Sequence, residues 1–64
     1  MDIESETAHI QEHIDRGNYH AGLNLTISAM NACRREENQD GVDYFLAMMK
    51  DIVNTMADEF GSKS

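Results

Sequence analysis

The residue types of this chain that are best suited to chemistry are histidine and cysteine. His9 and His13 stand four positions apart with Glu12 between them, and on a helix two histidines at that spacing can both reach one metal ion. A zinc protease would need its glutamate directly after the first histidine, where this chain has Ile10. No third ligand stands at a recognisable distance, although His20 could approach from the next helix. We therefore expect ordinary surface histidines and no metal or other cofactor.

Cys33 is the one cysteine in the sequence, so it cannot form an intramolecular disulfide. A nucleophilic role would need a base and an oxyanion site around its thiol, and a short helical chain offers no obvious pocket for them. We expect Cys33 to be a small buried side chain. Asp58 and Glu59 are neighbours on a helix, where their side chains point about 100° apart, so they do not form an acid–base pair. The sequence predicts that the protein is not an enzyme.

The composition restricts the class of partner. Twelve acidic residues against five basic ones give a net charge of -7, which argues against a conventional nucleic-acid-binding protein with a basic surface. The adjacent pair Arg34 and Arg35 is followed at once by Glu36 and Glu37. An acidic surface suits solubility, a basic protein partner or mimicry of a phosphate backbone. Since the sequence has no apolar run long enough for a signal peptide or a membrane span, we expect a cytoplasmic protein that contacts no membrane.

A capped amphipathic helix over residues 40–61 is the clearest structural signal. Asp40 is suited to cap this helix, and Gly61 follows its last apolar residue. The apolar positions fall within a sector roughly 120° wide, broader than the seam of a simple coiled coil. They are Val42, Phe45, Leu46, Met49, Ile52, Val53, Met56 and Phe60. Such a helix needs partner helices.

Two further helices are expected before it. Residues 3–15 form a short, weakly apolar helix that must dock on the others or fray. Residues 18 to about 37 partly alternate apolar and polar types, as a strand does, but their length, their alanines and the capping residue Asn18 favour a helix. That helix has two apolar faces and is expected to be a middle layer. One face consists of Tyr19, Leu23, Ile27 and Met30, and the other, small enough for close approach of a helix from a second subunit, consists of Gly22, Leu25, Ala29 and Ala32.

The sequence therefore predicts an all-α fold of three helices in a single domain, residues 1–61, followed by a frayed tail at residues 62–64. The short polar turn at residues 38–41 predicts that the second and third helices form an antiparallel hairpin. A chain of 64 residues is small, and such a domain buries only about 60% of the surface of its unfolded state. We expect a second copy to complete the interior in a homodimeric helical bundle.

The methionines are candidates for a binding surface, because thioether side chains repack around varied partners. Methionine more often belongs to a core or a dimer seam. Tyr44 and Met48 lie beside the main apolar stripe and are the better candidates for a partner groove. The predicted partner or dimer surface consists of Leu25, Ala29, Tyr44, Phe45, Met48, Met49, Ile52 and Met56.

The apolar frame of the chain begins with Ile10-x3-Ile14-x2-Gly17 and continues with Leu23, Ile27 and Met30. After an acidic turn it continues with Asp43-Tyr44-Phe45, Met49-x2-Ile52-Val53 and Ala57-Asp58. This frame resembles the small bacterial biofilm and acid-resistance regulators of the YmgB/AriR type, from Ile10 onward and mainly in its apolar positions. The resemblance implies a three-helix homodimer that acts as a connector in regulatory signalling without enzymatic activity, and it transfers no functional residue.

Together these observations predict a small, non-enzymatic, bacterial regulatory or adaptor protein that binds and modulates another protein through its helical surfaces. Two alternatives remain open. One is a co-chaperone of a secretion-system subunit, a class of similar length with a charged hairpin turn. The other is an acidic DNA mimic that inhibits a basic nucleic-acid-binding protein. Direct binding to nucleic acid fits the small number of basic residues poorly.

Replacing Met49 or Ile52 with Asp is expected to abolish folding and association together, because an unpaired charge would be buried in the apolar stripe. Circular dichroism and sedimentation of the two variants measure the outcome. A variant that stays a folded dimer would contradict the prediction.

Overall fold

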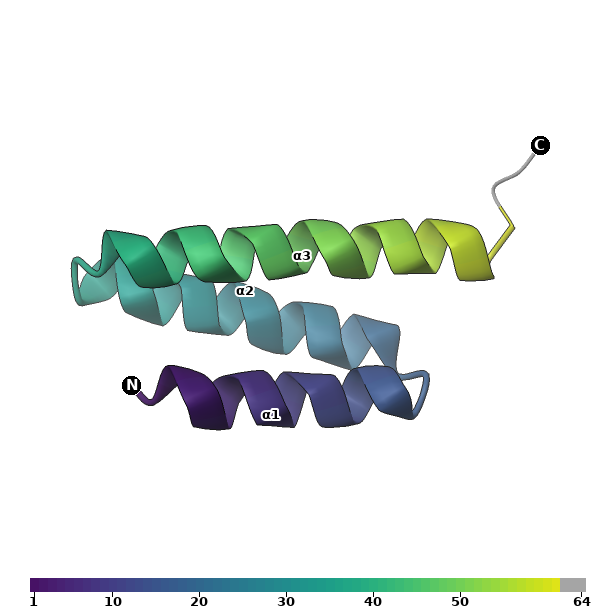
Figure 1. The fold of residues 1–64 in the computed structure, drawn as a ribbon, viewed down its shortest axis with the longest axis horizontal. Helices are drawn as coiled ribbons and strands as arrows, with labels where there is room; N and C mark the ends of the chain where they lie inside the picture. Colours follow the sequence, from purple (N-terminus) through teal and green to yellow (C-terminus); the bar gives the residue numbers. More distant parts are fainter. Residues whose placement is uncertain (62–64) are drawn as a thin grey trace.

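The computed structural model describes residues 1–61 and consists of three helices, of which the first and third run in one direction and the second in the opposite direction (Figure 1). They are α1 (Ile3–Asp15), α2 (Tyr19–Arg35) and α3 (Gln39–Glu59). The all-α fold and the antiparallel hairpin of α2 and α3 are confirmed. No strand occurs in residues 1–61. The predicted tail at residues 62–64 lies outside the described part of the chain.

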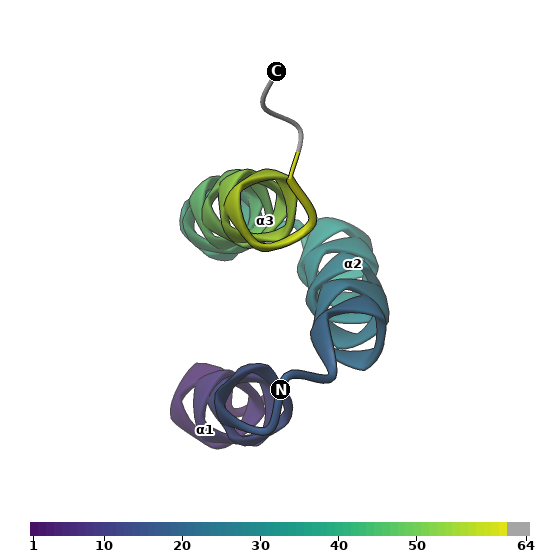
Figure 2. The ribbon, with the colours of Figure 1, turned by 90° about the vertical axis from the view of Figure 1, so that its right-hand side faces the viewer.

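The middle helix α2 packs against both of its neighbours. Seen along the helix axes, the three helices form an open C with α2 at its closed side (Figure 2). Helices α1 and α3 therefore pack mainly on α2 and only weakly on each other. The expected middle layer is present, and α1 docks on it within the same chain. The small-residue face of α2 was expected to allow close approach of another helix, from a second subunit. At Gly22 the helix that approaches is α1 of the same chain, since a Cβ there would lie 2.6 Å from Cδ1 of Ile14.

The core lies along both interfaces of α2. Phe45 of α3 and Cys33 of α2 are fully buried, and the burial expected for Cys33 is confirmed. The other buried apolar side chains are Ile10, Ala29, Met30, Val42 and Ile52. Thr26 is also fully buried, and its hydroxyl donates a 2.8 Å hydrogen bond to the carbonyl of Gly22 one turn earlier. Because this bond satisfies the hydroxyl, a polar residue is accommodated in the apolar interior.

The two turns between helices have the same construction. After α1, Gly17 has φ +83° and its N–H donates to the carbonyl of Ile14, while the N–H of Asn18 donates to the carbonyl of His13. After α2, the same pair of hydrogen bonds is made by the two residues that follow Glu36. This paired arrangement is a Schellman motif, which closes a helix with one left-handed residue. In both turns the residue after the left-handed one is an asparagine, which occupies the N-cap position of the following helix.

The cap of α3 differs from the prediction. The helix begins after Asn38, whose side-chain oxygen accepts a 3.1 Å hydrogen bond from the N–H of Gly41, so Asp40 is inside the first turn and is not the cap. The polar turn is correspondingly earlier than expected, at residues 36–38. Gly41 itself is buried in α3, where an added Cβ would lie 2.6 Å from Sγ of Cys33. It allows close packing of α3 on α2.

Helix α1 is capped by Asp2. Its carboxylate accepts hydrogen bonds from the Ser5 hydroxyl, at 2.8 Å, and from the N–H of Glu4, at 3.2 Å. The bonds from Ser5 are the main reason why the pKa of Asp2 is lower than its usual value, with a smaller contribution from Glu4. Since this folded-state pKa is depressed, the contribution of the cap to stability is present above the unfolded pKa and is lost as the pH falls through the folded value.

Replacing Glu37 with Gly is expected to stabilise the protein. Glu37 occupies the left-handed position of the second turn with φ 57°, where a side chain is strained. Removing that strain gains about 1–2 kcal/mol, and the greater freedom of glycine in the unfolded state offsets about 0.4–1 kcal/mol of it. Urea unfolding, measured in parallel on the parent chain, gives the difference.

Gly17→Ala is the matched control at the equivalent position of the first turn. It should lower the unfolding free energy by about 1 kcal/mol, because alanine is strained where glycine is not. If Glu37→Gly and Gly17→Ala unfold at the same urea concentration, the left-handed positions do not limit the stability of the protein.

Candidate functional site

A groove lies between α1 and α3. It lies on the open side of the C in Figure 2, opposite α2, and has a volume of about 520 Å³. From α1 it is lined by Thr7, Ile10, Gln11 and Ile14, and from α3 by Tyr44, Ala47, Met48, Asp51, Ile52 and Thr55. The groove exists because α1 and α3 both pack on α2 while making few contacts with each other.

The lining of the groove is apolar at its centre and polar at its edges. Ile10 and Ile52 are buried residues of the core, whereas Ile14 and Met48 are half-buried. At one place a hydrogen bond crosses between the two helices, from the hydroxyl of Thr7 to the hydroxyl of Tyr44, at 3.1 Å. Such a lining provides room for apolar side chains and leaves hydrogen-bonding groups beside them.

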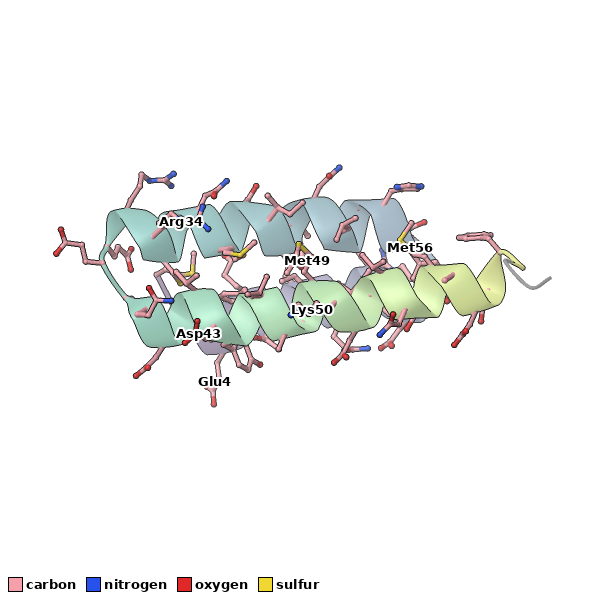
Figure 3. All side chains as sticks on the ribbon, turned by 90° about the horizontal axis from the view of Figure 1, so that it is seen from above. Glu4, Arg34, Asp43, Met49, Lys50 and Met56 are labelled. Atoms are coloured by element: carbon pink, nitrogen blue, oxygen red, sulfur yellow. The ribbon has the colours of Figure 1, made fainter. Side chains whose placement is uncertain are left out.

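The charges around the groove have one sign. Asp51 lines it directly, and Asp58 lies seven residues further along the same side of α3. On α1 the corresponding positions are Glu4 and Asp15, since they stand seven residues before and four after the lining residue Gln11. Figure 3 shows Glu4 projecting past α3 on the side opposite α2, where the groove opens. None of the lining residues is basic.

The basic residues lie elsewhere. Arg16 forms a 2.9 Å salt bridge with Glu12 on the exposed side of α1. Lys50 lies on the side of α3 that faces away from α1, and Arg34 belongs to α2 (Figure 3). Within residues 1–61 the only other salt bridge joins the N-terminal amine to Glu36. The acidic residues beside the groove therefore have no cation to neutralise them in the described chain.

A second, apolar surface lies on the hairpin away from α1, and we call it the outer hairpin face. Figure 3, a view from that side, shows Met49 and Met56 between α3 and α2. Val53 and Phe60 remain 48% and 68% exposed, and the ring of Phe60 meets Tyr19 edge-on. By helical spacing the face consists of Leu23, Ile27, Leu46, Met49, Val53, Met56 and Phe60. Helix α2 contains no acidic residue from Tyr19 to Arg35.

The structure separates the residues that the sequence predicted as one partner surface. Tyr44 and Met48 line the groove, as their position beside the apolar stripe indicated. Met49 and Met56 are half-buried on the outer hairpin face, and Leu25 is half-buried against the core. Ala29 and Phe45 are buried inside the single chain and are not surface residues in this fold, whereas Ile52 is buried but contributes to the lining of the groove.

Sequence reasoning did not identify the contribution of α1 to the groove. Ile10 and Ile14 were recognised only as the apolar face of a short helix, and Asp51 was not singled out. The signal for Asp51 was present, because it is seven residues after Tyr44, but the groove requires a second wall. Only the packing of α1 beside α3 supplies that wall.

The histidines and the cysteine that could do chemistry are not brought together into one site. The rings of His9 and His13 are 5.5 Å apart and tilted by 33°, and His13 buries Nδ1 without a hydrogen-bond partner. In residues 1–61 no three His, Cys, Asp or Glu side chains are grouped so that they could hold a metal ion. The thiol of Cys33 lies 3.9 Å from the sulfur of Met1 in the interior.

Adding zinc or a chelator is expected to leave the thermal unfolding curve unchanged, because the described residues hold no group of three metal ligands. A metal that did bind the folded state would raise Tm. Differential scanning calorimetry at neutral pH measures the effect. A rise in Tm with zinc that disappears in the variant His9→Ala would show that the histidine pair binds metal.

No helix in residues 1–61 is long and apolar enough to cross a membrane. Comparison with protein-family models, with curated proteins and with solved structures found no match for this chain.

Proposed function

We propose that this chain is a small, non-enzymatic adaptor that binds and modulates another protein through its helical surfaces. The observation that carries the proposal is the open arrangement around α2: three helices leave both a groove and an apolar outer face without a covering element. Large exposed apolar side chains that cluster on a monomer are typical of interaction sites. A regulatory connector, as the YmgB/AriR resemblance implies, acts through surfaces of this kind.

The two surfaces are suited to different contacts. The outer hairpin face combines exposed Val53 and Phe60 with an α2 surface that lacks acidic residues. Two copies of this chain, each with a net charge of -7, repel each other least where acidic side chains are absent. We therefore propose that a homodimer forms through the outer hairpin face and that the groove stays open for a different protein. A cytoplasmic location, where a single free cysteine stays reduced, fits such an adaptor.

The acidic DNA-mimic alternative is favoured by one observation, the row of unneutralised carboxylates beside the groove. A mimic of this kind would bind a basic partner through charge alone. Its binding would then weaken steeply with ionic strength and would not depend on the apolar lining.

The self-association proposal is tested with Val53→Asp, which places a charge on the outer hairpin face without burying it in the core. Analytical ultracentrifugation should show a dimer for the parent chain and a monomer of unchanged helical content for the variant. Ser28→Asp is the matched control, because Ser28 is exposed on α2 and outside both surfaces; it should remain a dimer. A parent chain that is monomeric at its highest soluble concentration contradicts the dimer.

The adaptor proposal itself is tested by cross-linking in cells with a photoreactive residue at position 48 or at position 28. A protein partner that cross-links from position 48 and not from position 28 is the expected result. The same cross-linked proteins from both positions would indicate collision without a binding site and would contradict the proposal.

A further inference from the structure

We propose that the groove between α1 and α3 binds a basic amphipathic helix of a partner protein, which completes a four-helix arrangement. This inference rests on the proposed function and assigns the chemistry of its partner. Its basis is the combination of shape, lining and charge at one place in the molecule.

The shape is that of an incomplete bundle. Helices α1 and α3 both run in the same direction beside α2, and the side opposite α2 is open (Figures 1 and 2). A fourth helix placed there would contact α1 and α3 as α2 does from the other side. Binding of an amphipathic helix in a groove between helices is a recurrent form of peptide recognition.

The lining selects an apolar stripe on the partner helix. Ile14 and Met48 present half-buried apolar surface above the buried Ile10 and Ile52. Met48 has a flexible thioether side chain that adapts to the shape of its contacts. Ala47 lies at the edge of the groove, where a larger side chain would block the approach of the partner helix.

The charge selects a basic helix and disfavours a second copy of this chain. Asp51 lies in the wall, and Glu4, Asp15 and Asp58 stand on the adjoining sides of α1 and α3. The described basic residues are on other faces, and Arg16 is already paired with Glu12. The carboxylate of Asp15 accepts a 2.9 Å hydrogen bond from Gln11, but none of the four carboxylates has a basic partner among the described residues. A lysine or arginine beside the apolar stripe of a partner would be attracted to them, whereas a second acidic chain would be repelled.

The test uses a fluorescein-labelled helical peptide with leucines on one face and lysines on the others, titrated against the full chain by fluorescence anisotropy. Two control peptides are matched to it. One keeps the leucines and has Glu in place of Lys, and the other keeps the lysines and has Gln in place of Leu. The proposal expects binding of the first peptide and at least about tenfold weaker binding of both controls, a difference of roughly 1.4 kcal/mol.

Variants of the chain locate the binding. Ala47→Trp obstructs the groove at an exposed position, and Asp51→Lys reverses the charge in its wall. Each substitution should weaken the binding of the leucine–lysine peptide by about tenfold or more. Ser28→Trp and Glu37→Lys are the matched controls for bulk and for charge, and each should leave the affinity within about threefold. Circular dichroism verifies that all four variants are folded.

Several outcomes would overturn the assignment. Equal affinity of the parent and Ala47→Trp would show that the peptide does not enter the groove. Equal binding of the lysine–glutamine control would show that charge alone suffices, as in mimicry of a phosphate backbone. Amide chemical shifts that change at Val53 and Phe60 instead of Tyr44 and Met48 would place the peptide on the outer hairpin face.

The inference and the proposed function fail separately. If the peptide does not bind the groove but a cellular protein cross-links from position 48 and not from position 28, the assignment of a basic helix is wrong and the adaptor function stands. If the peptide binds the groove as expected but no protein cross-links from position 48 in cells, the assignment stands and the adaptor function is wrong.

Discussion

The close packing of α2 on both of its neighbours is the interaction on which the rest of this structure depends. At one interface Gly22 lets Ile14 of α1 approach to a distance that a Cβ would prevent, and at the other Gly41 does the same for Cys33. Small residues at such contacts bring helices together and bury more of each apolar face. Because α2 uses two of its sides in this way, it becomes the middle helix, and α1 and α3 each keep one side that no other element covers.

This arrangement also separates the charges. Four acidic residues of α1 and α3, Glu4, Asp15, Asp51 and Asp58, lie beside the groove, while α2 between Tyr19 and Arg35 has no acidic residue at all. A small domain with a net charge of -7 is subject to self-repulsion, and placing carboxylates on the solvated faces reduces it. The molecule consequently has two unlike surfaces: an acidic groove with an apolar centre, and a largely uncharged apolar face on the hairpin.

The helices themselves were predictable because local signals agreed. Apolar spacing located all three, and the bounds of α1 matched the prediction, although its cap Asp2 was not identified from the sequence. The errors arose where two local candidates competed. Asp40 and Asn38 can both cap a helix, and the hydrogen bond from Gly41 to Asn38 decides between them. Thr26 is one of the polar residues in the alternating stretch of α2, yet its hydrogen bond to the Gly22 carbonyl allows it to be buried.

The sequence by itself determined the three helices, their hairpin turn, the acidic character and the buried cysteine, because each depends on residues within a few helical turns or on composition alone. Only the tertiary structure decided which side of each helix is covered. Phe45 and Met48 are both apolar and three positions apart on α3, but one is in the core and the other is in the groove wall. Periodicity locates an apolar stripe on a helix, but it does not show how much of that stripe a neighbouring helix buries. That limit is set by the close contacts at Gly22 and Gly41, which join residues distant in sequence.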